Sequence, residues 1–106
     1  MSLTKDVYQA TRSFPIEERF GLITQMRRSA VSIPSNLAEG RTRAGVNEFR
    51  RFISIALGSV AELETQITLS SELEFLNEQA AGDLLKQIDI IGKMLRGLYK
   101  ALGAKR

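Results

Sequence analysis

The stretch VNEFRRFISIALGSVAELETQITLSSEL, residues 46–73, has the most regular apolar pattern in the chain. Its apolar and small side chains recur at alternating spacings of three and four residues, at positions 46, 49, 53, 56, 60, 63, 67 and 70. This period places them on one face of an α-helix. We therefore predict a helix of roughly 28 residues here, about 40 Å long at 1.5 Å per residue. Gly45, with Glu48 three residues on, is one candidate cap for its start, and Thr42 is another.

The same helical period continues on the N-terminal side of this stretch. Apolar residues between Leu3 and Phe14 form a short helical pattern, which Pro15 interrupts because proline disfavours a helical residue before it. Pro15 suits the first turn of a new helix. The pattern resumes at Ile16 and continues through Leu37, so we predict a second helix that stops at Gly40.

A fourth helical pattern follows on the C-terminal side. Asn77 is a suitable N-cap residue, and the apolar period then runs to Leu102. No alternation typical of strands competes with this interpretation. The sequence therefore predicts an all-α, up-and-down four-helix bundle with a short first helix and three long helices, formed by residues 1–106 as a single domain.

The predicted helices differ in length. A first helix of roughly 11 residues is less than half as long as the third and cannot cover the whole groove beside it. The third helix also carries Phe52, Ile55 and Leu57 off its main apolar stripe. A face that wide usually has more than one neighbour. Either the second helix covers both sides or another subunit does, and we expect the protein to form a homo-oligomer.

The composition excludes most catalytic chemistry. The chain has no Cys and no His, so it lacks thiolates and the imidazole used in acid–base catalysis and most transition-metal sites. Glu62 and Glu64 are paired in sequence, but residues two apart on a helix point in different directions. We expect no catalytic residue, no cofactor and no metal site, and we predict that the protein is not an enzyme.

The sequence also bears on localisation. Its first residues, MSLTKDVYQA, lack the apolar region of a signal peptide. The apolar run FISIALGSVA, residues 52–61, is half of the roughly 20 residues that a membrane helix needs. We expect a soluble, cytoplasmic protein with no membrane partner.

The net charge of +3 is distributed unevenly. Residues 27–51 carry six arginines against two glutamates, and residues 86–106 carry six basic side chains against one aspartate. Between them, residues 52–85 carry six acidic side chains and no basic one. Such segregation predicts separate basic and acidic surfaces rather than a uniformly basic protein.

The arginines of the first basic segment are the candidate functional residues. A hairpin of the second and third helices brings four of them to one end of the bundle, and the other two lie about three turns lower. Arginine suits bidentate contact with phosphate, so all six are candidate nucleic-acid-binding residues. They are Arg27, Arg28, Arg41, Arg43, Arg50 and Arg51. No aromatic residue is interleaved in the loop, so we do not expect base stacking.

A structural polar motif, Pro34, Asn36 and Glu39, lies in the second helix. Pro34 frees the carbonyl of Ala30, and we expect a nearby donor to bond it. The candidate donors are Ser32, Ser35, Asn36 and Arg27. A structural kink is the first interpretation, and a ligand pocket at the kink is the alternative. Glu39 lies near a helix C-terminus, where an anion is disfavoured, so it should pair with an arginine. We attribute Gly58 to a close helix approach.

Residues 25–66, QMRRSAVSIPSNLAEGRTRAGVNEFRRFISIALGSVAELETQ, strongly resemble the bacterial four-helix bundle family called 23S rRNA intervening-sequence proteins. The shared pattern is Q-x-R-R-[AS]-x-x-S-I-x-x-N-[IL]-A-E-G, then E-F-x-x-F, then A-x-G-S-x-x-E-L-x-T. The resemblance extends from Phe14 to the end of the chain. Gly45 stands where a capping Ser is common, and Glu74 stands where a Gly is common. Both departures concern helix ends.

This resemblance also implies partners. The family includes the accessory variability protein of diversity-generating retroelements, which looks like a homopentameric barrel with a basic surface that binds nucleic acid and a partner reverse transcriptase. The resemblance therefore implies a pentamer, and it implies nucleic acid and a reverse transcriptase as partners. For most members of the family the function is unassigned.

Two hypotheses of function follow. The first is a non-enzymatic oligomer that binds RNA or DNA phosphates through the arginine-rich surface and serves as a scaffold for an RNA-handling enzyme such as a reverse transcriptase. The second is a structural or protein-interaction bundle whose arginines stabilise its own subunit interfaces.

Overall fold

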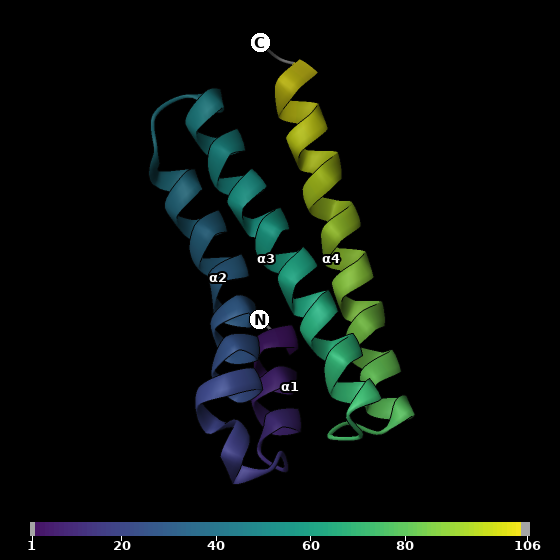
Figure 1. The fold of residues 1–106 in the computed structure, drawn as a ribbon. Helices are drawn as coiled ribbons and strands as arrows, with labels where there is room; N and C mark the ends of the chain where they lie inside the picture. Colours follow the sequence, from purple (N-terminus) through teal and green to yellow (C-terminus); the bar gives the residue numbers. More distant parts are fainter. Residues whose placement is uncertain (1, 105–106) are drawn as a thin grey trace.

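The computed structural model describes residues 2–104 and, for residue 19, the backbone alone. It contains α1 (Ser2–Thr11), α2 (Thr24–Thr42), α3 (Val46–Glu72) and α4 (Glu78–Ala104), with no strand in the described part of the chain (Figure 1). This architecture confirms the predicted all-α four-helix bundle. One helix is short, at 10 residues, and the other three are longer, at 19, 27 and 27 residues.

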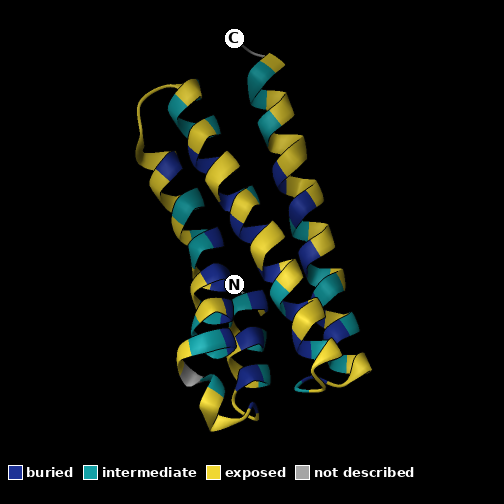
Figure 2. Ribbon diagram, viewed as in Figure 1, coloured by how far each residue is buried: buried dark blue, intermediate teal, exposed yellow. Residues whose placement is uncertain are grey.

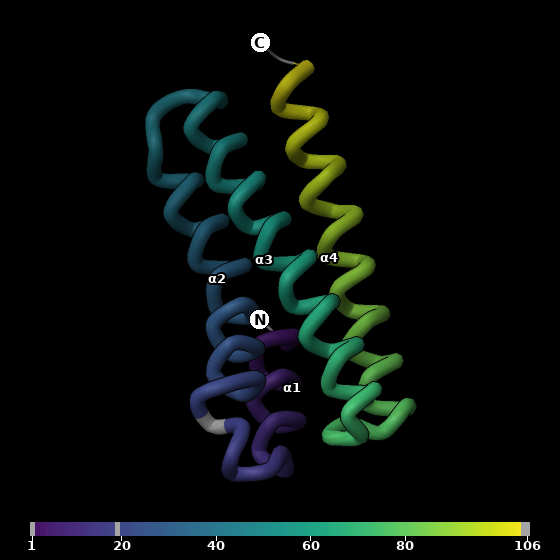
Figure 3. The backbone as a smooth tube through the Cα atoms, in the orientation of Figure 1, coloured from purple at the N-terminus to yellow at the C-terminus, as the bar shows by residue number. Residues whose placement is uncertain are grey.

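The helices follow one another up and down the bundle. α3 packs against both α2 and α4, and α1 packs against α2 and α4 on the other side. Because α1 is short, it lies beside only the lower part of these helices as drawn, and α2, α3 and α4 extend well beyond it (Figures 1 and 3). The upper part of the bundle is therefore built from three helices rather than four.

The core is one cluster of apolar side chains contributed by every helix. The inward faces of the helices are buried along the length of the bundle (Figure 2). Side chains with no exposed surface include Val7, Met26, Ile33, Ile53, Leu63, Ile67 and Ile88. Of the three residues expected off the main stripe of α3, Phe52 is buried, Leu57 is half-buried and Ile55 is 41% exposed. The bundle thus covers the wide apolar face of α3 only in part.

The prediction of one continuous second helix from Ile16 is wrong. The chain instead forms a 3-10 turn, η1 (Ile16–Glu18), and a π turn, η2 (Arg19–Ile23), before α2 begins at Thr24. Gly21 has a non-helical backbone conformation, with φ −107° and ψ −112°. Glycine lacks the Cβ that makes such a conformation costly for other residues, so the kink falls there.

The interhelical turns show which predicted caps are used. Gly45 has φ +93° and is the N-cap residue of α3, which confirms the first of the two candidate positions. Glu48, expected to complete half of a capping box, instead pairs with Arg51. Thr42 is instead the last residue of α2, where its hydroxyl donates to the carbonyl of Glu39 at 2.8 Å. Asn77 caps α4 as predicted, because its Oδ1 accepts from the N–H of Ala80 at 2.8 Å.

Two glycines, Gly40 and Gly58, do not have the roles expected from the sequence. Gly40 does not end α2, which continues to Thr42. A Cβ at Gly40 would lie 2.7 Å from the Cβ of Phe52, so this glycine permits close packing of α2 on α3. A Cβ at Gly58 would meet no atom within 4 Å, and the expectation of a close helix approach there is wrong.

α3 is unusually apolar for a helix that is incompletely covered. By length and composition alone it is the one described helix that meets the criterion for a membrane span, a test that the core helix of a soluble protein also passes. Only 39% of its most apolar 18-residue window is buried inside the bundle.

Candidate nucleic-acid interface

The end of the hairpin between α2 and α3 carries the predicted arginine group. Arg41 lies in the last turn of α2, and Arg43 follows in extended conformation, with φ −81° and ψ 148°. Beside them is an open depression of about 420 Å³, lined by Gly40, Arg41, Arg43, Gly45, Val46 and Phe49. The side chains of both loop arginines are exposed. The loop therefore presents two cations at the edge of a shallow hollow.

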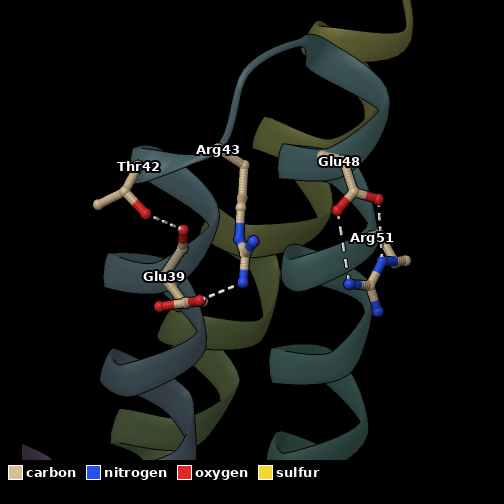
Figure 4. A network of polar contacts seen from close by, with 5 residues as sticks. All are labelled: Glu39, Thr42, Arg43, Glu48 and Arg51. Carbon is tan, nitrogen blue, oxygen red and sulfur yellow. Dashed lines mark hydrogen bonds and ion pairs between the residues drawn. The ribbon is translucent and has the colours of Figure 1, made fainter.

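Two local ion pairs hold part of this surface (Figure 4). The guanidinium of Arg43 donates to the carboxylate of Glu39 one turn earlier, which confirms the arginine partner expected for Glu39. On the neighbouring helix, Arg51 Nε donates to Glu48 Oε1 at 3.1 Å. Both pairs are roughly half exposed to solvent, so each contributes little to stability.

A buried aromatic residue, Phe52, contacts the guanidinium groups of both of these arginines. The guanidinium carbons of Arg51 and Arg43 lie 4.6 and 5.3 Å from the centre of the Phe52 ring. Phe52 as a whole is only 8% exposed. It can orient the two cations through cation–π attraction, but it is not accessible to stack on a nucleotide base.

Arg50 has a different environment from its neighbour Arg51. Its Nε donates to the backbone carbonyl of Tyr99 at 3.1 Å, and its guanidinium lies 4.0 Å from the centre of the Tyr99 ring. The side chain also lies against Gly103, where an added Cβ would come within 2.8 Å of Nη2. Arg50 therefore fastens the start of α3 to the last turns of α4.

The lower pair of arginines is separate from the loop group, as expected. Arg27 Nε donates to Thr11 Oγ1 at 3.0 Å, and its guanidinium lies 4.6 Å from the centre of the Tyr8 ring. It thus joins α2 to the end of α1. Arg28 is exposed, and with the side chains that the structure describes neither Arg28 nor Arg41 makes an ion pair or a side-chain hydrogen bond.

Pro34 lies inside α2, and the donor to the carbonyl that it frees is not local. Thr4 Oγ1 of α1 donates to the carbonyl of Ala30 at 3.3 Å, so the expectation of a donor within α2 is wrong. Asn36 Nδ2 bonds the carbonyl and hydroxyl oxygens of Ser32 at 2.8 and 2.9 Å. Ser59 of α3 continues this chain with a 2.7 Å bond between its hydroxyl and that of Ser32. These polar residues therefore connect α2 to the helices on both sides of it.

The sequence did not reveal the two tyrosines that bind the guanidinium groups of Arg27 and Arg50. Tyr8 and Tyr99 take up the guanidinium groups of Arg27 and Arg50 across 19 and 49 positions of the chain. No local pattern links such distant residues. No group of three acidic side chains in the described part of the chain is placed to hold a metal ion.

The fold and this surface define an all-α bundle with an arginine-rich end. The sequence matches the 23S rRNA-intervening sequence protein family over residues 1–97, and the chain belongs to that family. This result confirms the resemblance seen in the sequence.

A solved structure extends the comparison. It is the crystal structure of a protein of unknown function from the S23 ribosomal protein family of Bacteroides thetaiotaomicron. It superimposes with a TM-score of 0.81, is 22% identical, and the match covers 92% of this chain and 88% of that one. At this identity the likeness shows the fold alone. No curated protein matches the chain.

Proposed function

We propose that the protein is a non-enzymatic homo-oligomer that binds the phosphates of RNA or DNA through the end of the α2–α3 hairpin. The observation that carries this proposal is the exposed arginine group around the open depression beside the loop. Arg41 has no ion-pair partner in the described part of the chain. Arg43 and Arg51 have only solvent-exposed ones, which a phosphate can replace at little cost.

The backbone beside the loop supports the same ligand chemistry. α3 is 27 residues long and begins at this depression. Its N-cap residue is Gly45, which has no side chain to accept a hydrogen bond from the first N–H groups of the helix. Such free N–H groups and the positive end of the helix dipole both favour an anion. Arg41 and Arg43 add full charges at the same place.

The six candidate arginines then divide by role. We assign phosphate contact to Arg41, Arg43 and Arg51, which are exposed at the end of the bundle. Arg27 and Arg50 are half-buried and engaged with other helices, so we assign them to structure. Arg28 is exposed but lies about 20 Å along α2 from Arg41, given 1.5 Å per residue. It belongs to a second, weaker contact region.

Self-association is part of the proposal. A ring repeats the arginine group in every copy, so the potentials add and one nucleic acid can contact several subunits. Family resemblance suggests five copies and an RNA-handling enzyme such as a reverse transcriptase as a protein partner. We propose a cytoplasmic location as well. In this arrangement the bundle is a scaffold that brings nucleic acid and enzyme together.

A second candidate function uses the same arginines at subunit interfaces, with no nucleic acid bound. The ion pair of Arg43 with Glu39 favours it, because this pair is already satisfied without a ligand. The two candidates differ in what loss of the loop arginines does. If the loop arginines bind phosphate, their loss weakens nucleic-acid binding and leaves the oligomer intact. If they are interface residues, their loss breaks the oligomer.

A filter-binding titration of the wild-type protein with single-stranded RNA and with DNA of mixed sequence tests the proposal. We expect weak dependence on sequence and a steep fall of affinity with salt. Each neutralised phosphate contributes about 0.7–0.9 to the slope of log affinity against log salt concentration. Absence of binding to either nucleic acid at low salt would refute the proposal.

A further inference from the structure

The outer face of α4 carries an exposed apolar stripe with a row of lysines beside it. Ile90, Met94 and Leu98 are 59%, 68% and 37% exposed, and their spacing of four residues places them on one side of the helix. An apolar patch of this kind, edged by charge, marks an interaction surface. Lysines at seven-residue spacing run alongside it, at positions 86, 93 and 100. We call Ile90, Met94 and Leu98 the α4 stripe.

The opposite half of the bundle carries a groove of complementary character. The groove has a volume of about 400 Å³ and lies between the start of α2 and the second half of α3. It is lined by Leu22, Gln25, Ala61, Glu62, Thr65, Gln66 and Leu69, and we call it the α3 groove. Leu69 is 43% exposed within it. Glu64 and Glu72 line the adjoining hollow, so the α3 groove is apolar with an acidic edge.

The two surfaces match in length and in charge. The α4 stripe and the span from Ala61 to Leu69 each cover eight residue steps, about 12 Å of helix. The lysines of α4 would meet the carboxylates that edge the groove. Lys93 is paired with Asp89 of its own helix at 3.0 Å, and this exposed pair is weak enough to rearrange.

The two surfaces cannot meet within one chain. The second half of α3 and the second half of α4 lie at opposite ends of the bundle (Figure 1). The bundle exposes 6582 Å² of surface, against roughly 5,900 Å² expected for a compact monomer of its mass. The excess of roughly 700 Å² accompanies the elongated shape of the bundle, 47 × 23 × 18 Å, in which long helix faces are left uncovered.

We infer that a second copy of this chain occupies the α3 groove and that it inserts its α4 stripe there. This inference rests on the self-association contained in the proposed function. The two surfaces of the contact differ, so each copy can donate its stripe to one neighbour and accept the stripe of another. A contact of this heterologous kind closes into a ring when the rotation between neighbours permits it. It leaves the arginine-rich loop free.

Two single variants, sized without nucleic acid by light scattering, test the inference. Met94→Asp places a charge on the α4 stripe, and Leu69→Asp places one in the α3 groove. Both side chains are exposed in the single chain, so each variant should keep its helical circular dichroism. Val31→Asp is the matched control, because Val31 is 40% exposed but belongs to neither surface.

We expect the wild type and the control to be oligomers and each test variant alone to have the monomer mass of 11.8 kDa. An equimolar mixture of the two test variants should form a species of twice that mass and no larger one. One intact stripe and one intact groove remain in the mixture, and they allow a single contact.

Several results would overturn the inference. If both test variants form oligomers of wild-type size, the interface lies elsewhere. If Met94→Asp is a monomer and Leu69→Asp is still an oligomer, the α4 stripe packs against another α4 stripe instead of the groove. Failure of the mixture to associate excludes the pairing of stripe and groove. A monomeric wild type refutes this inference and the self-association together, whereas the RNA titration reports on phosphate binding independently of both.

Discussion

Thr4 Oγ1 donates a hydrogen bond to the carbonyl of Ala30, the group that Pro34 deprives of its usual partner inside α2. The bond is 3.3 Å long and joins residues 26 positions apart. Ala30 is fully buried, so its carbonyl would otherwise lack a donor. A hydroxyl of the short first helix thus compensates for a proline in the second.

The first prediction is a coupling between these two sites. Thr4→Val keeps the shape of the side chain but leaves the carbonyl unpaired, so it should lower the free energy of unfolding by about 1–2 kcal/mol. In a Pro34→Ala background the helix regains its own N–H donor, and the same change should cost less than half as much. Urea denaturation of the four proteins at one concentration measures this difference. Equal costs in both backgrounds would contradict the link.

Pro34→Ala alone should preserve both the helical content and the oligomer, because the helix on either side of the proline is already regular. Circular dichroism and light scattering check this. Loss of the fold in this variant would show that the proline itself sets the packing of α2 on its neighbours.

The second prediction separates Arg50 from Arg51. Arg50→Lys loses the fixed fork that bonds the Tyr99 carbonyl and stacks on its ring, so it should destabilise the protein by about 1–2 kcal/mol. Arg51→Lys keeps the charge at an exposed ion pair and should cost under about 0.5 kcal/mol. Thermal unfolding of both variants provides the comparison. A larger loss for Arg51→Lys would remove the structural role assigned to Arg50.

The third prediction contrasts two glycines. Gly40→Ala pushes a methyl group against the Cβ of Phe52 at 2.7 Å and should destabilise the bundle by about 1–3 kcal/mol. Gly58→Ala meets no atom within 4 Å and should stabilise α3 by about 0.5–1 kcal/mol. Urea midpoints measure both effects. Opposite signs would mean that α2 and α3 approach each other at Gly58 instead.

The sequence was sufficient to predict the features that depend on residues close to one another along the chain. The apolar period predicts four helices, and the Asn77 cap and the arginine partner of Glu39 each lie within four residues of the groups they contact. Repeating spacings and helix-end preferences are local, so they can be recognised before the chain is folded. The kink at Gly21 escaped notice because the apolar pattern continues across it.

The features that escaped the sequence depend on packing between helices. The Thr4–Ala30 bond, the contact of Arg50 with Tyr99 and the approach of Gly40 to Phe52 join segments whose spacing has no period. For the candidate site, the sequence placed the loop arginines together but could not show which guanidinium groups are already occupied. That division depends on where Tyr8 and Tyr99 lie in the folded chain.

The most direct measurement for the central claim compares salt dependence of RNA binding in the wild type, Arg41→Glu/Arg43→Glu and the control Lys5→Glu/Arg12→Glu. The two double variants change the net charge equally, and the control residues are exposed on or beside α1. We predict a weaker affinity and a salt slope smaller by about 1–2 for the loop variant. Its oligomer size and melting temperature should stay the same, and the control should lose much less affinity. Equal losses in both variants, or an oligomer that falls apart when the loop arginines are replaced, would contradict phosphate binding at the α2–α3 loop.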